Sequence, residues 1–233
     1  MDKSYQGLSM KTVSTYNFEK KLKEIKLLMP YAVPAEHLEQ ATEFVAGLAD
    51  DIIGLNLCHN FYSFLPEPED DYIVNIALIA RREGTFLLLA RTGLAGYVYL
   101  VNQEKAEFIG IADEKNWNQE LLDFFGYQDS AALTRQLGNS DMLQAYIPTC
   151  EDENICPSCQ AEHGEFHTLG CPLEICPWCD GQLTSCNCRF TKLASDQVKR
   201  VKDIEKFNKI LNAKGRIPYN KNERLAFPAL DDS

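Results

Sequence analysis

The residues of this chain best suited to chemistry are cysteines and histidines that gather in one short stretch. Eight of the nine cysteines lie within residues 150–188. Two Cys-Pro-x-Cys pairs occur there, Cys156/Cys159 and Cys176/Cys179. A Cys-x-x-Cys pair places two thiolates on one tight turn, where both can point at the same cation. Because tetrahedral Zn²⁺ takes four Cys or His ligands, the stretch supplies enough for two closed sites.

The sequence predicts that the two sites follow each other along the chain, since grouping neighbours keeps each chelate loop short and lowers the entropy of closure. The expected ligands are Cys156, Cys159, His167 and Cys171 for the first Zn²⁺, and Cys176, Cys179, Cys186 and Cys188 for the second. Two alternatives stay open: His163 in place of His167, or a crossed arrangement in which the two Cys-x-x-Cys pairs share one ion. An iron–sulfur cluster is the alternative where all four ligands are cysteines, but a histidine beside these turns favours zinc.

Four protein ligands per ion leave no position for water or substrate, which is typical of structural rather than catalytic zinc. Such an ion contributes on the order of 10 kcal/mol to a module with little core of its own. The chain has no Gly-x-Ser-x-Gly elbow, phosphate loop or dinucleotide fingerprint. His59 follows Cys58, but a nucleophile pair needs both side chains on one substrate and a third orienting group. A hydrolase is therefore disfavoured, and we expect no catalytic residues.

Two segments carry a resemblance to a known group. The run His167-Thr-Leu-Gly-Cys-Pro-Leu-Glu-Ile-Cys-Pro-Trp-Cys-Asp-Gly-Gln-Leu-Thr-Ser-Cys-Asn-Cys188, followed by Lys214-Gly-Arg-Ile-Pro-Tyr219, resembles a zinc-ribbon-like module of uncharacterised bacterial proteins. The resemblance covers residues 156–220 and implies zinc binding without an activity. Those proteins often carry another cysteine pair after the Gly-Arg-Ile-Pro segment, which is absent here, so no third site is expected.

The N-terminal part more distantly resembles a superfamily of bacterial toxin-immunity domains related to a yeast cell-wall regulator. The similarity lies in the order of its strands, a Gly96-Tyr-Val-Tyr99 segment, an Ile109-Gly-Ile-Ala-Asp113 segment and a helix near Trp117. The Leu-Pro and Asn-Gly-Gly signatures of that superfamily are missing. The resemblance implies an immunity-type inhibitor of a toxin.

The composition predicts a folded protein, because 45% of the 233 residues are apolar. No apolar run approaches the roughly 18 residues that a membrane span needs, and the first 15 residues lack the apolar centre of a signal peptide. We therefore expect a cytoplasmic protein without a membrane association. In that compartment, clustered cysteines more often hold metal than form disulfides.

The charge is unevenly spread along the chain. The net charge is -11, with -16 on residues 1–188 and +7 on residues 189–224. An acidic body suits docking onto a basic protein partner, such as a toxin. The rival hypothesis is a nucleic-acid-binding regulator that would contact phosphates through the zinc ribbon and a basic helix. The helix residues that would do so are Lys199, Arg200, Lys202, Lys206 and Lys209.

Periodicity predicts the elements that position these sites. Helical spacing is expected from Phe18 to Leu28 and from Pro34 to Ile52, a loop at Asn56–Asp71, more helix within 121–146, and an amphipathic helix at Asp196–Leu211. Strand-like runs lie at Tyr72–Ala80, Phe86–Ala90, Gly96–Val101 and Phe108–Ala112. Their links of five or six residues are too short for crossover helices, so the sheet should be antiparallel.

The sequence thus predicts an α+β fold: an antiparallel sheet with N-terminal helices, then a small di-zinc module and a C-terminal amphipathic helix. The expected parts are a flexible leader at 1–16, an α+β domain at 17–148, a zinc-binding module at 149–190, and a basic helix with an extended tail at 191–233. The leading functional hypothesis is a non-catalytic bacterial zinc-binding protein that acts through protein–protein interaction.

Overall fold

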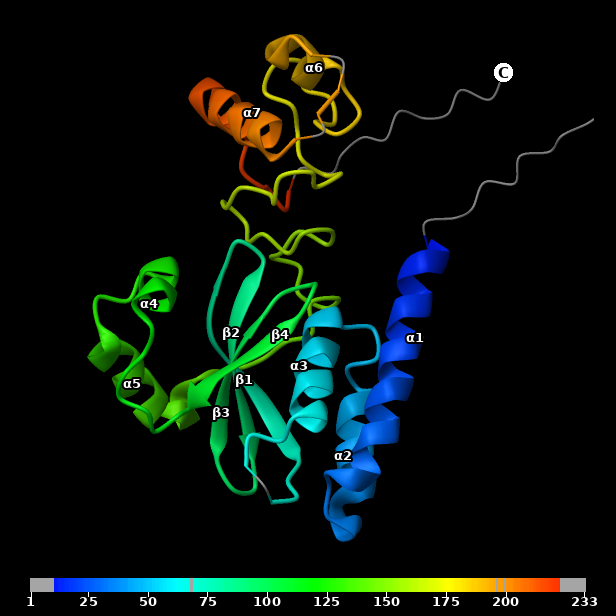
Figure 1. Ribbon diagram of the computed structural model, residues 1–233, viewed down its shortest axis with the longest axis vertical. Coiled ribbons are helices and arrows are strands. Elements are labelled where there is room, and N and C mark those ends of the chain that lie inside the picture. The colour runs from blue at the N-terminus through cyan, green and yellow to red at the C-terminus, as the bar shows by residue number, and fades with distance from the viewer. Residues whose placement is uncertain (1–10, 68, 196, 199, 223–233) are drawn as a thin grey trace, which may run out of the picture. The chain divides into compact units, whose positions relative to one another are not determined.

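The structure of the chain is a computed structural model that describes residues 11–67, 69–195, 197–198 and 200–222 (Figure 1). Most of the expected leader therefore lies outside the described residues. Contacts within the chain divide it into two compact units. The first comprises Met1–Arg81 and Thr85–Glu151, and the second Arg82–Gly84 and Asp152–Ser233. The predicted α+β class is confirmed.

The first unit is built on a five-stranded antiparallel sheet. Its strands are β1 (Ile73–Arg82), β2 (Thr85–Thr92), β3 (Gly96–Val101), β4 (Ala106–Ile111) and β5 (Gln144–Ala145). Neighbouring strands follow the order β4-β3-β2-β1-β5, so the first four form the expected meander. Pairing continues between β2 and β3 from Phe86 opposite Val101 to Arg91 opposite Gly96.

Strand β5 corrects the sequence prediction, which placed helix at residues 141–146. A short 3-10 helix (η3, Ser140–Met142) occupies the start of that segment, and the chain then pairs with β1. Ala145 lies opposite Ala77, and Tyr146 N–H donates to Ile76 O at 3.0 Å. The backbone N–H and C=O groups at the edge of β1 need hydrogen-bond partners, and the segment after η3 supplies them. The periodicity of a local sequence does not show such a distant pairing.

Both faces of the sheet are covered, because alternate residues of its strands are apolar on both sides. Leu87, Leu89 and Val98 point to one face and pack with Trp117 and with helices α4 (Gln119–Phe125) and α5 (Ser130–Gly138). The opposite face carries Phe86, Leu88 and Tyr99, which are also buried. Helix α3 (Ile52–Ser63) packs on β3 and β4, and α1 (Lys11–Leu28) packs on α3. The N-terminal helices thus cover one face.

The helices of the first unit divide differently from the prediction. A single apolar stripe was expected from Pro34 to Ile52 and a loop after Asn56. Instead, two short 3-10 turns, η1 (Met29–Tyr31) and η2 (Ala35–His37), precede α2 (Leu38–Ala46), and α3 continues through Ser63. Eight of the twelve residues of α3 are buried. A helix that is apolar on nearly all sides shows no amphipathic stripe, so periodicity misses it.

Asp51 fixes the start of α3 and ties it to the segment after β5. Its carboxylate is fully buried and accepts from Gly54 N–H at 2.9 Å, which caps the helix. The same carboxylate accepts from Tyr146 Oη at 2.8 Å and from Thr149 N and Oγ1 at 3.1 and 2.7 Å. Every carboxylate oxygen is therefore paired, which lets the charge lie in the core.

We expect Asp51→Ala to destabilise the first unit by about 2 to 3 kcal/mol, because it removes a helix cap and leaves buried donors of Tyr146 and Thr149 without an acceptor. Urea unfolding followed by circular dichroism measures the change. Asp50→Ala is the matched control, since Asp50 is exposed and its removal should change the free energy of unfolding by less than about 0.5 kcal/mol. Equal effects of the two substitutions would contradict this role of Asp51.

Within its described residues, the second unit has the helices α6 (Cys188–Leu193) and α7 (Val201–Lys214). Helix α7 starts five residues later than predicted, because the carboxylate of Asp203 accepts from Arg200 N–H at 3.3 Å and caps the first turn. Phe207 and Leu211 of α7 are buried with Leu183 and Leu193 in a small core. Among the described residues, no helix combines the length and apolarity that crossing a bilayer requires.

Candidate metal centres

A tight backbone turn presents the first Cys-Pro-x-Cys pair. Cys156 N–H donates to Ala161 O at 2.8 Å, and Gln160 N–H donates back to Cys156 O at 2.8 Å. Gln160 has a φ of 61°, the left-handed conformation that reverses the chain after Cys159. This closed turn keeps the two thiol groups of the pair within 4.8 Å of each other, so that both can contact the same ion.

The second Cys-Pro-x-Cys pair repeats this turn twenty residues later. Cys176 N–H donates to Gly181 O at 2.7 Å, and Asp180 N–H donates to Cys176 O at 2.9 Å. Asp180 takes the left-handed conformation with a φ of 57°. Single antiparallel bridges flank the two turns, between Ile155 and Glu162 and between Ile175 and Gln182. The two pairs therefore share one local fold.

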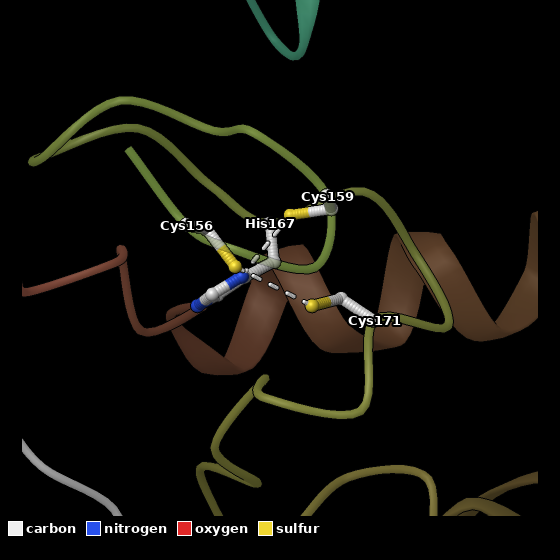
Figure 2. A group of neighbouring side chains, drawn as sticks. All are labelled: Cys156, Cys159, His167 and Cys171. Carbon is white, nitrogen blue, oxygen red and sulfur yellow. Dashed lines mark hydrogen bonds between the residues drawn. The ribbon is translucent and has the colours of Figure 1, made fainter. Parts of the chain in front are cut away.

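Four side chains converge at the first turn: Cys156, Cys159, His167 and Cys171 (Figure 2), whose ligand atoms all lie within 4.8 Å of one another. The separation is 3.9 Å between Sγ of Cys156 and Sγ of Cys171, and 3.3 Å between Sγ of Cys159 and Nδ1 of His167. A tetrahedral Zn²⁺ with Zn–S of about 2.3 Å and Zn–N of about 2.0 Å holds two sulfurs about 3.8 Å apart and a sulfur and a nitrogen about 3.5 Å apart. The first group is thus spaced to hold one such ion.

His167, and not His163, belongs to the first group. Figure 2 shows one ring nitrogen of His167 pointing into the group and the other pointing away. His163 is exposed, and its Nδ1 accepts from Lys221 N–H at 3.3 Å. The crossed arrangement is not formed either, because Cys176 and Cys179 lie in the other group.

The charges of the first group are strongly coupled. Hydrogen bonds from Cys156 and Cys171 hold the pKa of Cys159 well below its usual value, whereas hydrogen bonds with Cys159 and Cys171 raise that of Cys156. Burial lowers the pKa of His167, but hydrogen bonds to Cys159 and Cys171 and their charges outweigh this and raise it to about 9. Several thiolates at this spacing repel one another, so a cation among them is needed to ionise all three.

A segment that follows α7, Arg216–Lys221, covers the first group and is called the covering segment here. Gly164 N–H donates to Tyr219 O at 2.9 Å, and Tyr219 N–H donates to Glu165 O at 2.8 Å. The Tyr219 ring lies edge-on to the His167 ring with centroids 5.4 Å apart, and its hydroxyl donates to Ile155 O at 3.2 Å. All four ligand side chains of this group are buried.

A buried ion pair fastens the covering segment. Arg216 Nε donates to Glu174 Oε1 at 2.5 Å, and Arg216 Nη2 donates to the backbone carbonyl of His167. The side chain of Glu174 is 0% exposed and that of Arg216 is 10% exposed. Neither residue had a role predicted from the sequence. The available signal was an acidic residue between the predicted ligands Cys171 and Cys176, and the structure buries its side chain.

The second group brings together Cys176, Cys179, Cys186 and Cys188, again with all ligand atoms within 4.8 Å. Cys176 is buried, Cys186 and Cys188 are half-buried, and Cys179 is exposed. The buried side of this group packs against Leu193, Phe207 and Leu211, so it joins α6 to α7. The eight predicted ligands therefore form the two groups that were expected to follow each other along the chain.

Surroundings set the acidity of these thiols as well. Burial raises the pKa of Cys176 to about 12. The backbone N–H of Gly181, with hydrogen bonds to Cys176 and Cys188, lowers the pKa of Cys179, and the hydrogen bond with Cys179 raises that of Cys188. A group of four thiols that each need to lose a proton binds a divalent cation with proton release.

The other residues considered from the sequence lie apart from these groups. Cys58 is fully buried, and burial raises the pKa of its thiol. His59 Nε2 lies 3.7 Å from Glu24 Oε2 on a half-exposed surface. Burial lowers the pKa of His59. These surroundings are those of a core thiol and a partly exposed imidazole, which do not form a common site.

Comparisons of the chain with models of known protein families, with curated protein sequences and with solved structures find no significant match.

Proposed function

We propose that this chain is a non-catalytic zinc-binding protein in which two structural Zn²⁺ ions hold the second unit in its fold, and that it acts by binding another protein. The observation that carries the zinc assignment is the gathering of two sets of four Cys and His ligand atoms, each set within 4.8 Å. Four protein ligands complete a tetrahedron, so neither ion would have a position for substrate.

Zinc fits both sets of ligands better than an iron–sulfur cluster. A cluster distributes its cysteine ligands over several iron atoms, whereas the four ligand atoms of each group lie close enough to surround one ion. A histidine in the first group suits zinc further, because Cys₃His is a common structural zinc set. Zn²⁺ would leave the first group with one excess negative charge and the second with two. Arg216 contacts the backbone carbonyl of His167, but its charge is paired with that of Glu174.

Elemental mass spectrometry on the purified chain tests the zinc assignment directly. We expect two Zn per chain, and one after His167→Ala, because the first group then keeps only three ligands. His163→Ala and Cys150→Ser are matched controls outside both groups and should retain two. Iron in place of zinc, or a metal-free protein purified under reducing conditions without chelator, would overturn the assignment.

The interaction surface that we propose is an acidic end of the first unit. It consists of exposed residues near the ends of α1 and α3: Tyr31, Glu36, Phe64, Glu67, Glu69 and Asp70. The two segments meet there, since Asp71 N–H donates to Ala32 O at 2.8 Å and the rings of His37 and Tyr72 stack 4.7 Å apart. Tyr31 and Phe64 are 86% and 73% exposed.

Exposed aromatic side chains within a charged surface are typical of interaction sites, because a partner buries the ring while charge steers the approach. The negative charge at this end favours a basic protein as the partner. An immunity-type inhibitor of a basic toxin is the more specific version of this proposal. It is supported by the distant N-terminal resemblance and by the acidic character of the first unit.

Affinity capture at two ionic strengths tests the partner. The bait is the full chain, and the measured quantity is retention of a basic protein identified by mass spectrometry. We expect retention to fall at high salt and to be lost when Phe64→Ala is combined with Glu67→Gln, Glu69→Gln and Asp70→Gln. The control neutralises Glu104, Glu107 and Glu120, exposed acidic residues on other elements. Equal loss in the control would overturn the assignment of the surface.

A specific observation also favours the rival function. Lys202, Lys206 and Lys209 are exposed on one face of α7, at the spacing of successive helical turns. Arg200 is paired with Asp203 at 3.0 Å, and Lys199 lies outside the described residues. Such a stripe can follow a phosphate backbone.

Fluorescence anisotropy with labelled single-stranded RNA and duplex DNA decides between the two functions. If the chain is a protein-binding module, neither nucleic acid should bind with a Kd of about 1 μM or below at 150 mM salt, whereas specific binders have a Kd of about 10 nM or below. Salt-sensitive binding that is lost on changing all three lysines to glutamate would instead establish the nucleic-acid function.

A further inference from the structure

The two metal-ligand groups differ in how well the chain shields them, although their turns share one fold. In the first group all four ligands are buried, and the covering segment closes over His167 through Tyr219. In the second group only Cys176 is buried, and the thiol-bearing Cys179 is exposed. Sulfur that is both anionic and accessible is the form that oxidants attack.

We propose that the second group is an oxidant-reactive site, at which a hydroperoxide converts Cys179 and Cys188 to a disulfide and displaces the metal ion. This inference rests on the proposed zinc binding and adds a form of regulation to it. The sulfurs of this group lie within 4.8 Å of one another, and Cys186 and Cys188 are the half-buried ones. Cys188 is the expected partner because Cys186 Sγ is engaged with Leu183 O at 3.6 Å.

The reaction balances with hydrogen peroxide as the oxidant. The Cys179 thiolate attacks one peroxide oxygen, the O–O bond breaks, and a sulfenic acid and hydroxide form. The Cys188 thiolate then attacks the sulfenic sulfur, the S–O bond breaks, and a second hydroxide leaves as the S–S bond forms. Two thiolates have lost two electrons to the peroxide, and Zn²⁺ leaves with its charge unchanged because two ligands no longer bind it.

The consequence would be local, because the second group contributes to a defined part of the core. Cys176, Cys186 and Cys188 lie in the cluster that holds Leu193 of α6 against Phe207 and Leu211 of α7. Loss of the ion would loosen this cluster and with it α7. The first group and its covering segment have their own small cluster with Leu173 and Tyr219, so they should keep their ion.

The experiment uses zinc-loaded full chain in the Cys150→Ser background, which removes the one exposed cysteine outside both groups. A few equivalents of hydrogen peroxide are added, and a colorimetric zinc indicator follows release. We expect one Zn per chain to be released roughly tenfold or more faster than the other. Peptide mapping should find a Cys179–Cys188 disulfide, and limited proteolysis should become faster within residues 195–214.

Two variants separate this site from general oxidation. Cys179→His keeps a zinc ligand but removes the exposed sulfur, and should slow the fast phase roughly tenfold. Cys171→His makes the same change in the buried group and should leave the fast phase unaltered. If either variant binds fewer than two Zn, the disulfide found by peptide mapping in the protein with all eight ligands decides whether Cys179 and Cys188 are the reactive pair.

The outcomes distinguish the two proposals. A protein that purifies without zinc would overturn the proposed function itself. Two bound ions that are released together, earlier release from the first group, or a disulfide among Cys156, Cys159 and Cys171 would leave zinc binding intact and overturn the oxidant-reactive site.

Discussion

Removing the metal ions with a strong chelator should unfold the second unit and leave the first unit folded. Structural zinc contributes on the order of 10 kcal/mol per ion to modules of this kind, which is comparable to the whole stability of a domain. The apolar clusters of the second unit are small and include the ligand cysteines themselves. The first unit instead has a core between a sheet and helices on both faces.

The two tryptophans of the chain make this outcome measurable, because one lies in each unit. Trp117 is buried against the sheet of the first unit, and Trp178 lies within the second Cys-Pro-x-Cys turn beside Phe207. In a Trp117→Phe protein, the remaining fluorescence of Trp178 should shift to the red on chelation and return when zinc is added. In a Trp178→Phe protein, the emission of Trp117 should not change.

The converse pattern would contradict the prediction. If Trp117 also shifted on chelation, the ions would support both units. If the emission of Trp178 did not shift although elemental analysis confirmed metal loss, the turns would be stable without an ion. The metal would then not be needed to hold the second unit in its fold.

Replacing Arg216 with alanine should destabilise the second unit by about 3 to 5 kcal/mol, even with zinc in excess. The reason is that Glu174 is fully buried and would lose the guanidinium that pairs with it, and a buried charge without a partner is costly. The carbonyl of His167 would lose the donor from Arg216 as well. Urea unfolding followed through Trp178 in the Trp117→Phe background measures the free energy.

Two further variants identify the cause. Arg200→Ala breaks an ion pair with a similar N–O distance, 3.0 Å from Asp203, but Arg200 is 79% exposed, so its loss should leave the free energy of unfolding nearly unchanged. The double variant Glu174→Leu with Arg216→Met removes both charges and should recover much of the lost stability, because buried pairs are often replaced by apolar residues at little cost. A double variant as unstable as Arg216→Ala would show that packing of the arginine stem, rather than the charge, is responsible.

The candidate metal centres could be anticipated from the sequence because their ligands are close along the chain. The turn after Cys156 closes through hydrogen bonds between residues at most five apart. Short chelate loops then restrict which further residues can reach the same ion. His167 could not be separated from His163 in this way, since both lie within reach, and the choice depends on Tyr219 and Arg216, about fifty residues away.

Structural features that depend on residues far away in the sequence were not predicted. Helix α3 was expected as a loop beyond Asn56 because burial on nearly all sides removes its periodic pattern. Strand β5 forms because the edge of β1 provides hydrogen-bond partners for Gln144 and Ala145. The buried pair of Glu174 and Arg216 joins residues 42 positions apart. The four strands of the meander, by contrast, are separated by short polar links and carry apolar runs, so their positions follow from local sequence.

The covering segment also has a consequence for biosynthesis. The ligands of the second group lie between Cys176 and Cys188, and its packing is complete once Leu211 of α7 has been added. The first group also needs Arg216 and Tyr219, which lie 49 and 64 residues beyond the carbonyls of His167 and Ile155 that they contact. At a translation rate of about 5 to 20 residues per second, the ribosome needs roughly 3 to 10 s to add that length. The first group therefore leaves the ribosome before the second but is completed after it. Its cysteine sulfurs stay exposed to solvent on the nascent chain until the covering segment has been synthesised.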